Sequence, residues 1–410
     1  MEVKVIITPI WTGDIDQRSE LLQLLGFVGS LRWWAEAILR SDNNRYACDP
    51  TSDGRCPKED RNKKYYCSAC LIFGATGIRR TFRLNVSGGK RTFVGRPLNI
   101  KPSGRNKGWY LGTGIVGEIN LEIIHLDKDF DESLALLPLI IASKWGGIGA
   151  KTQHGYGVVK IEDCPKIEFN RFKEAIEKIT DKERLSKFKI ELRHENNNGL
   201  PNLREMFFAK VQFEVTDENW WKQIDGIRSD NKSDEQRRHR EYENDQRMIN
   251  WVSSGSVPIA PAIKNWLRFG KKITTKEGKK IQVSPFSEVY NKRISNWLFG
   301  KSEENNKTAS KINISCAYPV NDNLWEFRIW GWIPKDGSPA RFDRNGFLNN
   351  LKQILNSSGS IKIPWNKLLG DQTKNHKLEI WREYNSLRDT VKPNESDINN
   401  YIQSLLEGEE

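Results

Sequence analysis

The chain of 410 residues is 37% apolar and carries 65 Lys and Arg against 53 Asp and Glu, a formal net charge of +12. Its length allows two or three domains, and no apolar run approaches the roughly 20 residues that cross a bilayer. The first residues, MEVKVIITPIW, alternate as a strand does and lack the features of a secretory leader. We therefore expect a folded cytosolic protein that does not span a membrane.

The first 165 residues contain the patterns of one ferredoxin-like unit. Alternating apolar residues predict strands, and apolar residues at helical spacing predict helices. In chain order we predict a strand at 3–7, a helix at 26–42, strands at 81–86 and 114–124, a helix at 132–145 and a strand at 156–162. A polar insertion separates the first helix from the next strand, and the stretch 88–108, rich in Gly, Lys and Arg, is predicted to be a mobile loop.

The rest of the chain predicts a connector and a second copy of the same order. A charged amphipathic helix is predicted at 169–192, followed by a strand at 207–215, a helix at 256–270, strands at 309–320 and 324–334, a helix at 345–355 and a last strand within 357–365. Residues 225–247 alternate in charge and predict a solvated or disordered insertion. The sequence thus predicts an α+β protein with two ferredoxin-like (βαββαβ) domains in tandem, residues 1–165 and 200–410, joined by a helical connector at 166–199.

Positive charge is concentrated in two stretches. Residues 26–110 hold 17 Lys and Arg against 6 acidic residues, and residues 261–311 hold 12 against 4. Both stretches are rich in aromatic residues, so they indicate a polyanionic partner such as a nucleic acid. A charge surplus alone is equally compatible with a solubilising surface.

A glycine-rich segment, KWGGIGAKTQHGYGVV, occupies residues 144–159. It does not fit a P-loop, because Ala150 precedes Lys151 where a glycine is required, and it does not fit a dinucleotide fingerprint, because it opens a strand. Bare backbone beside lysines can instead lie along a phosphodiester, and aromatic rings in the loop can stack on bases. The alternative is that glycines such as Gly155 and Gly157 only permit tight turns and close packing.

Four motifs together resemble the RAMP superfamily of CRISPR effector proteins. They are TPIWTGD, GFVGSLRWWAEAIL, LIFGATGIRRTFRLNV and WGGIGAKTQHGYG. Within that superfamily the chain is most similar to the two-domain subunit at the head of the type III-B (Cmr) complex, closely across residues 1–165 and more loosely across 200–410. The resemblance implies a non-catalytic subunit in antiviral defence that sits at the crRNA 3′ end and contacts single-stranded target RNA and other RAMP subunits.

The resemblance and the charge pattern agree on RNA as the ligand, held by backbone contacts and stacking. We expect contacts from the first helix, from the basic residues around the second strand, from the glycine-rich loop and from a helix of the second half. The predicted RNA-binding residues are Arg32, Trp33, Arg79, Arg80, Arg83, Lys144, Gly146, Gly147, Gly149, Lys151, His154, Gly155, Gly157, Lys264 and Arg268.

The insertion at 41–70 contains four of the six cysteines, with Cys67 and Cys70 forming a C-x-x-C pair. A polar segment of this kind cannot fold on its own core, whereas a structural zinc ion contributes about 10–16 kcal/mol of apparent binding energy. We therefore predict a structural Zn²⁺ site made of Cys48, Cys56, Cys67 and Cys70. A redox C-x-x-C pair and four free, reduced thiols are the alternatives.

Two other functions remain open at this point. A metal-independent endoribonuclease that processes CRISPR RNA could use His154 as a general base on a ribose 2′-hydroxyl, and Asp14 and Asp16 offer acidic groups for cleavage of target RNA. A pure assembly subunit would hold its neighbours through apolar faces and touch RNA only incidentally. The salt dependence of RNA binding separates that function from RNA recognition.

Overall fold

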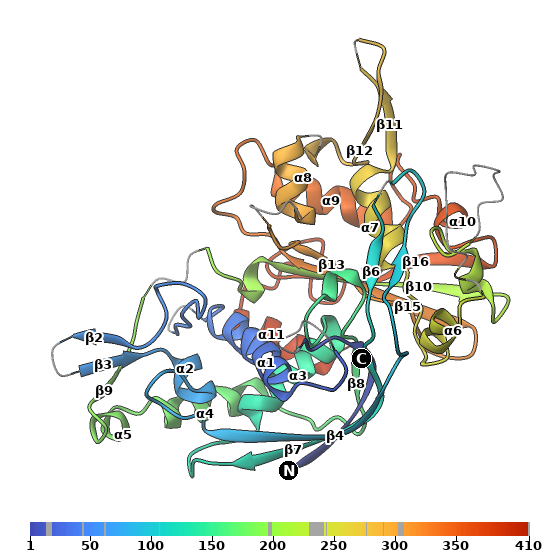
Figure 1. The fold of residues 1–410 in the computed structure, drawn as a ribbon. Helices are drawn as coiled ribbons and strands as arrows, with labels where there is room; N and C mark the ends of the chain where they lie inside the picture. Colours follow the sequence, from blue (N-terminus) through green and yellow to red (C-terminus); the bar gives the residue numbers. More distant parts are fainter. Residues whose placement is uncertain are drawn as a thin grey trace.

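The computed structural model describes residues 1–408 except 14–18, 43–44, 61–62, 106, 196–198, 229–241, 243, 276, 290 and 302–306. In this part of the chain two four-stranded paths of antiparallel strands form the main sheets, and smaller ribbons project from them (Figure 1). None of the helices in the described ranges is both long and apolar enough to cross a membrane.

The first sheet has the strand order β4-β7-β1-β8, and every pairing in it is antiparallel. Its strands are β1 (Glu2–Ile10), β4 (Phe82–Arg91), β7 (Ile115–His125) and β8 (Val159–Ile161). Helix α1 (Leu24–Leu39) follows β1, and α3 (Ser133–Trp145) follows β7. The alternating side chains of Val3, Val5 and Ile7 are buried, as the pattern predicts. This order of strands and helices is ferredoxin-like.

The second sheet repeats the arrangement in the order β13-β15-β10-β16. Its strands are β10 (Met206–Val215), β13 (Ile312–Ile314), β15 (Leu324–Trp332) and β16 (Thr373–Glu383), and β14 (Tyr318–Pro319) pairs with β15. Between them come α6 (Gln246–Val252), α7 (Ala260–Phe269), α8 (Lys292–Phe299), α9 (Arg344–Leu355) and α10 (Trp365–Leu368). The predicted tandem of ferredoxin-like units is therefore confirmed.

Two predicted segments differ from the structure. The single helix expected at 169–192 is divided into α4 (Phe169–Ile179), α5 (Lys182–Ser186) and a short strand, β9 (Ile190–Leu192). The division follows from Asp181, whose side chain accepts a hydrogen bond from the Arg184 N–H and so starts a new helix. The last strand expected within 357–365 is also wrong, because the closing strand is β16, whose polar first half conceals its alternation.

The stretch 88–108 does not form the free loop that its composition predicts. β5 (Leu98–Ile100) and β6 (Trp109–Leu111) pair as a ribbon that lies on the second half of the chain. The Asn99 N–H donates to the Tyr242 hydroxyl at 2.7 Å, and three apolar residues of the ribbon are fully buried there. A second ribbon, β11 (Lys271–Thr274) with β12 (Lys280–Val283), projects from the body beside it (Figure 1).

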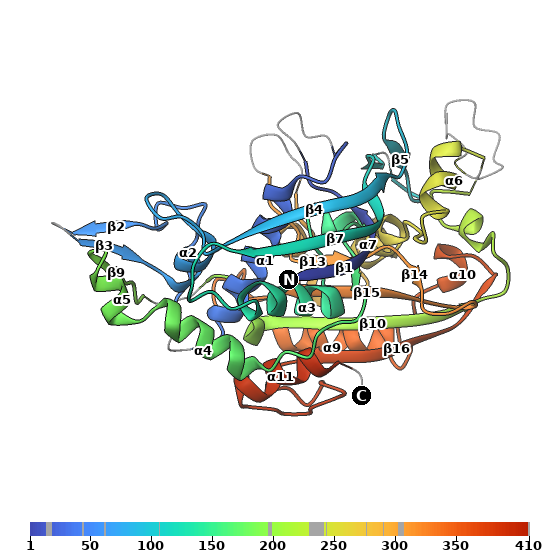
Figure 2. The same cartoon turned by 90° about the horizontal axis from the view of Figure 1, so that it is seen from below.

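The two units share one apolar core at their junction. Phe208 and Trp330 of the second sheet belong to the same buried cluster as the residues of α1 and α3. The Trp34 ring of α1 stacks on Phe208 with 6.3 Å between centroids. The C-terminal helix α11 (Ile398–Glu407) returns to pack against α3 and α4 (Figure 2). Helices of the first unit therefore also cover part of the second sheet.

Candidate metal centre and nucleic-acid interface

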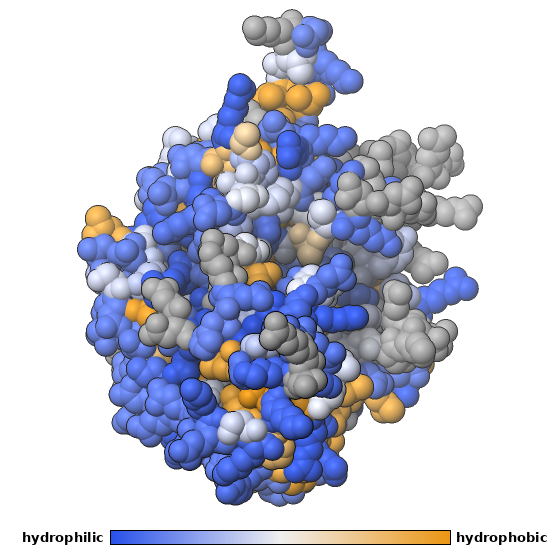
Figure 3. Space-filling view, turned by 90° about the vertical axis from the view of Figure 1, so that its left-hand side faces the viewer, coloured by the Kyte–Doolittle hydropathy of each residue, from blue (hydrophilic) through white to orange (hydrophobic). Residues whose placement is uncertain are grey.

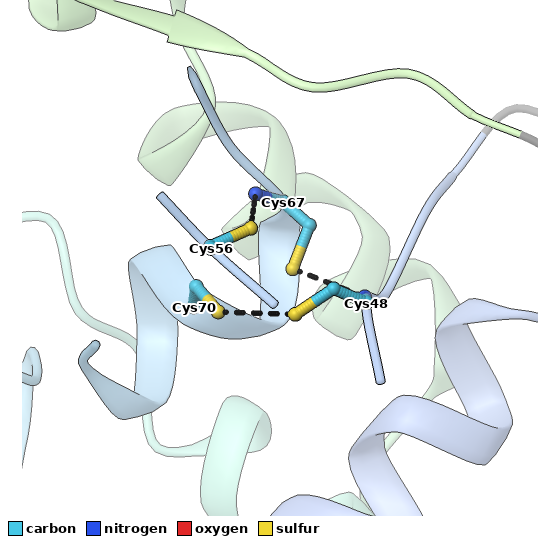
Figure 4. Close-up of side chains that lie close together, drawn as sticks. All are labelled: Cys48, Cys56, Cys67 and Cys70. Atoms are coloured by element: carbon cyan, nitrogen blue, oxygen red, sulfur yellow. Dashed lines mark hydrogen bonds between the residues drawn. The ribbon is translucent and has the colours of Figure 1, made fainter. Parts of the chain in front are cut away.

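The four cysteines of the insertion lie together in the structure (Figure 4). Their sulfur atoms are all within 4.8 Å of one another, and all four side chains are buried and free of disulfides. Cys67 precedes the short helix α2 (Ser68–Phe73), and Cys70 lies within it. Cys48 and Cys56 come from irregular chain before the ribbon of β2 (Lys58–Asp60) and β3 (Lys63–Tyr66). The fold thus closes the wide spacing between the first two cysteines.

The spacing of the sulfurs fits one tetrahedral ion. Zn–S bonds of about 2.3 Å place the sulfurs of a tetrathiolate site about 3.8 Å apart, and the Cys48 and Cys70 sulfurs are 3.6 Å apart. The Cys48 N–H donates to the Cys67 sulfur at 3.4 Å, and the Cys67 N–H donates to the Cys56 sulfur at 3.3 Å. Such donors stabilise thiolates, the form that binds metal, so the residues present can hold a metal ion.

Arginine side chains complete the surroundings of the cysteines. Arg32 of α1 donates to the Cys70 sulfur at 3.1 Å, and Arg193, which follows β9, donates to the Cys56 sulfur at 3.8 Å. Hydrogen bonds from Cys48 first, and then from the other two cysteines, hold the pKa of the Cys56 thiol far below its usual range. A group of four interacting sulfurs differs from an isolated redox C-x-x-C pair.

Two residues of α1 predicted to bind RNA have internal partners instead. The Arg32 guanidinium donates to Glu36 and to the Gly74 carbonyl as well as to the cysteine cluster, and its side chain is only 18% exposed. Trp33 is half-buried and packs edge-on against Trp34 with 5.0 Å between centroids. Arg32 is therefore bonded to the Cys-rich region, residues 41–70, and Trp33 lies at the junction of the two units.

The glycine-rich loop passes between the two units rather than along an open groove. A methyl group at Gly146 would collide with the ring of Trp34, and one at Gly157 would collide with the Ile148 carbonyl. Gly157 also has a φ of +94°, in the region that favours glycine. The packing alternative therefore accounts for both residues, and the same holds for the buried Gly147, whose carbonyl accepts a hydrogen bond from Trp34 Nε1 at 3.0 Å.

Residues of the second unit bind the loop from the other side. Arg328 donates to the Gly146 carbonyl at 3.2 Å, and the Cys316 N–H donates to the Gly155 carbonyl at 2.9 Å. Gly146, Gly147, Gly155 and Gly157 are buried, so protein atoms surround these four glycines, which were predicted to contact RNA. Only Lys144 and the segment from Gly149 to His154 reach the surface between residues 144 and 159, and the RNA prediction for this loop is confined to them.

The two loop lysines differ in their partners. The Lys144 ammonium donates to the Leu406 and Glu407 carbonyls, at 2.6 and 3.0 Å, and so caps the end of α11. The Lys151 ammonium lies over the Trp11 ring, 3.8 Å from its centroid, and burial lowers the pKa of this lysine. Lys144 therefore joins the C-terminal helix to the first unit, and Lys151 stays a candidate for RNA contact.

His154 is poorly suited to general-base catalysis. Its Nδ1 atom is buried without a hydrogen-bond partner among the described residues, and its ring packs edge-on against Trp109 with 4.8 Å between centroids. Burial, with smaller effects of Lys264 and Lys151, lowers the pKa of His154 to about 3. So weak a base does not favour the endoribonuclease alternative. Asp14 and Asp16 lie outside the described residues.

The basic residues around the start of β4 lie at the free edge of the first sheet. Arg79 and Arg83 are exposed and Arg80 is half-buried. Arg79 donates to the Leu126 carbonyl at 3.3 Å. Within the described ranges none of the three forms an ion pair with a carboxylate, so their RNA contact stays a prediction.

The two predicted residues of α7 lie beneath the ribbons. Lys264 is only 2% exposed, and its ammonium donates to the Ser310 hydroxyl at 2.8 Å and to the Ile312 carbonyl at 3.2 Å, which leaves it inside the protein. Arg268 is half-buried and donates to the Gly300 carbonyl at 2.9 Å. Lys264 is thus enclosed, whereas Arg268 lies near the surface.

The two basic stretches of the sequence meet at Phe269. The Arg105 guanidinium of the first ribbon lies 4.1 Å from the centroid of the Phe269 ring, and that of Arg268 lies 5.1 Å from the same centroid. Gly104 lies against the Gln282 side chain of β12. Arg105 was not predicted as a site residue, although the charge surplus of residues 26–110 included it.

Comparisons with known proteins agree with the motif likeness in the first part of the chain. Residues 5–160 match the model of the RAMP superfamily. No curated protein matches the chain. Among solved structures it is similar to apo Cmr1 from Pyrococcus furiosus, at 14% identity and a TM-score of 0.34, over 82% of this chain and 89% of that one. It is also similar to a chain of the type III-B Cmr-beta complex bound to cognate target RNA and AMPPnP, at 13% identity and a TM-score of 0.34, over 82% and 96%.

Proposed function

We propose that this chain, whose residues 5–160 match the RAMP superfamily, is a non-catalytic RNA-binding subunit of a type III-B CRISPR effector complex. The family match and the four sequence motifs support the assignment to such a complex. In this proposal the subunit works in the cytoplasm beside other RAMP subunits, at the crRNA 3′ end, and contacts single-stranded target RNA.

The observation that carries the RNA assignment is the meeting of the two basic stretches on one surface. We call this surface the basic ridge. It consists of side chains from the β5–β6 and β11–β12 ribbons: Lys101, Arg105, Lys107, Lys272, Lys279 and Lys280. Throughout the described part of the chain, none of these six side chains forms an ion pair with a carboxylate. Glu277, in the turn of the second ribbon, is also exposed and bonds Thr275, so the ridge presents a net positive charge to a polyanion.

The electrostatics beneath the ridge favour an anion at the same place. Burial first, and then the charge of Arg105, lowers the pKa of Arg268 to about 10. Burial also lowers the pKa of Arg105. Two guanidinium groups thus flank one aromatic ring, and Lys264 adds a third cation close to Arg268. A phosphate beside Arg105 would relieve this repulsion and form charge-assisted hydrogen bonds, whereas Arg268 already donates to Ser295, Gly300 and Asn296.

An aromatic side chain on the first ribbon offers a stacking surface. Tyr110 is 63% exposed, although its neighbours Trp109 and Leu111 face the protein. Base stacking on an aromatic ring contributes about 1–3 kcal/mol per base in single-stranded complexes and does not depend strongly on sequence. This suits a subunit that leaves sequence recognition to pairing between guide and target. On the face seen in Figure 3 hydrophobic residues lie among hydrophilic ones.

The test is the salt dependence of single-stranded RNA binding by the purified protein. The triple variant Arg105→Ala, Lys272→Ala and Lys280→Ala should lose about tenfold or more in affinity near 0.1 M salt. The slope of log affinity against log salt should fall by about 2, because each lost phosphate contact removes about 0.7 from it. Fluorescence anisotropy with a labelled oligonucleotide measures both quantities.

A control variant removes the same number of positive charges, but from positions outside the ridge. Lys166, Lys335 and Lys362 are exposed, and their triple alanine variant should bind RNA as the unchanged protein does. The variant Arg32→Ala, Lys144→Ala and Lys151→Ala should weaken binding less than the ridge variant, because two of these side chains hold internal partners. Equal slopes for the ridge variant and the control would contradict the proposal, and site-specific RNA cleavage would contradict its non-catalytic part.

We also propose that the four cysteines bind one structural Zn²⁺ ion. The mutual spacing of their sulfurs and the two backbone N–H donors support a tetrathiolate site. Elemental analysis of the purified protein should find one zinc per chain, and thiol titration should reach these four cysteines only after a chelator is added. Absence of metal together with four freely reacting thiols would contradict the zinc assignment and leave the RNA assignment intact.

A further inference from the structure

The polar face of α1 contains a ladder of charges directed at the Cys-rich region. Arg32, Glu36 and Arg40 are spaced four residues apart and so lie on one face of the helix. The Glu36 carboxylate accepts from Arg32 at 2.7 Å and from Arg40 at 3.2 Å. The side chains of Glu36 and Arg40 are 4% and 2% exposed, so water does not compensate their charges.

Both ends of the Cys-rich region are held by this ladder. Arg32 donates to Cys70 at the far end, and Arg40 donates to the Ala47 and Cys48 carbonyls at the near end, at 2.9 and 2.7 Å. Arg40 also donates to the Pro201 carbonyl at 3.4 Å, where the chain leaves the connector. One helix face therefore contacts two of the four cysteines and a segment about 160 residues further along.

A third arginine approaches the cysteines from the connector. Arg193 is 5% exposed and donates to the Gly54 carbonyl at 2.6 Å and to the Cys56 sulfur. Its backbone N–H donates to the Tyr66 carbonyl at 2.9 Å, next to the parallel pairing of β3 with β9. The segment of the connector that pairs with β3 is thus fixed beside the metal ligands.

The formal charges of these buried groups are complementary to a divalent tetrathiolate. Three arginines face two carboxylates, the buried Glu36 and the half-exposed Glu195, which accepts from Arg193 at 2.6 Å. They leave a positive excess around the cysteines, whereas one divalent ion on four thiolates carries two negative charges. Leaving either set without the other would bury uncompensated charge, which is strongly unfavourable. The three arginines therefore offset part of the negative charge of a single divalent ion bound by all four cysteines.

We infer that Arg32, Arg40 and Arg193 are the counter-charges of the metal centre, and that metal binding is coupled to the docking of the connector on the Cys-rich region. The inference rests on the proposed zinc site. These arginines are positioning residues, since they act on the ligands and do not contact the ion. Loss of the ion leaves the positive charges unbalanced, so the pairing of β9 with β3 weakens together with the metal site.

The experiment follows the loss of zinc to a chromogenic chelator from the full-length protein. Arg32→Gln and Arg193→Gln should each bind zinc about 10–100-fold more weakly and release it correspondingly faster, the effect typical of groups that support metal ligands. Arg193→Lys, which keeps the charge, should recover part of the loss. Arg388→Gln is the matched control, because Arg388 is also about one-fifth exposed and bonded to a buried carboxylate, Glu383, but lies far from the cysteines in the sequence.

Hydrogen exchange of the wild-type protein provides a readout that does not depend on the folding of any variant. Removal of the metal should increase exchange in peptides covering 58–70 and 186–195, and should leave peptides of β10 and β16 unchanged. If the wild type holds zinc but the variants release it at the wild-type rate, the inference fails and the zinc site stands. If exchange rises only in 58–70, the coupling to the connector is contradicted. If the wild type holds no metal, the proposed site fails and this inference fails with it.

Discussion

The Cys-rich region and the basic ridge both come from basic stretches of the sequence, yet their electrostatics are opposite. Around the cysteines, Arg32, Arg40 and Arg193 donate to a carboxylate, to carbonyls and to sulfur, and their charge is used inside the protein. Around Phe269, Arg105 has an aromatic ring and a second guanidinium as its neighbours. A positively charged stretch of sequence is therefore available to a ligand only where the fold provides no internal hydrogen-bond acceptors for its side chains.

This difference separates stability from binding. Removing a charge with internal partners leaves buried acceptors unsatisfied and should reduce the free energy of unfolding. Removing a charge of the ridge leaves nothing unsatisfied and should affect affinity alone. Four variants test the division, beginning with the one that has the largest expected effect.

Arg40→Met should lower the free energy of unfolding by about 3–5 kcal/mol, the cost of breaking a buried ion pair by removing one partner. Glu36 and the Ala47, Cys48 and Pro201 carbonyls all lose a donor. Chemical denaturation measures the change. The control Arg171→Met removes an exposed pair with Asp131 and should cost less than about 1 kcal/mol. Equal losses for the two variants would show that the buried and the exposed arginine contribute equally to stability.

Gly157→Ala tests whether the glycine-rich loop is needed for the stability of the protein or for RNA binding. The substitution forces a positive φ on alanine and brings its methyl group against the Ile148 carbonyl, so the loss should be about 3 kcal/mol. Gly29→Ala, at a helical site with open space around it, should instead stabilise by up to about 1 kcal/mol. A stable Gly157→Ala protein with weakened RNA binding would indicate that the loop contacts RNA and that its glycines are not required for packing.

Tyr110→Ala should weaken single-stranded RNA binding by about 1–3 kcal/mol, the contribution of one stacked base, and should leave the thermal midpoint unchanged because the ring is 63% exposed. Tyr110→Phe keeps the ring and should bind as the wild type does. Anisotropy titrations of the two variants at one salt concentration give the answer. An equal loss in both would mean that the hydroxyl, rather than stacking, is responsible.

His154→Gln should flatten the dependence of stability on pH. Because burial lowers the pKa of His154 to about 3 in the folded protein, only the unfolded chain gains a proton on this side chain as pH falls below about 6.5. Stability is therefore lost toward acid, and between pH 7 and 5.5 the wild type should lose about 1 kcal/mol more than the variant. Parallel curves from urea denaturation would show that His154 is solvated.

Much of the fold could be predicted because its core patterns are local. The alternation of Val3, Val5 and Ile7 and the helical spacing in α1 depend on neighbours within a few residues, and the repeated order of elements indicated two ferredoxin-like units. The connector was harder, since Asp181 ends one helical pattern and begins another without changing the apolar spacing. The Cys-rich insertion was identified from composition, and the structure brings its four cysteines together.

The sequence predicted that the candidate site would be basic, but it did not identify all of the residues that form it. The charge surplus of the two stretches was visible, but no local signal distinguished Arg105 from Arg32, although one is left without an acid and the other is bonded to Glu36 and Cys70. The glycines of the loop had the same ambiguity between ligand contact and packing. Nothing near Arg193 in the sequence indicated its place beside Cys56.

The amino-acid sequence alone determined the class of fold, the grouping of the cysteines and the excess of positive charge, because each depends on residue type and short spacing. Tertiary structure decided which charges are satisfied inside and which face outward. It did so by bringing together groups more than 100 residues apart, such as Arg40 with Pro201 and Arg105 with Phe269. Free energy at such contacts depends on burial and on the partner present, and neither is encoded at a single position.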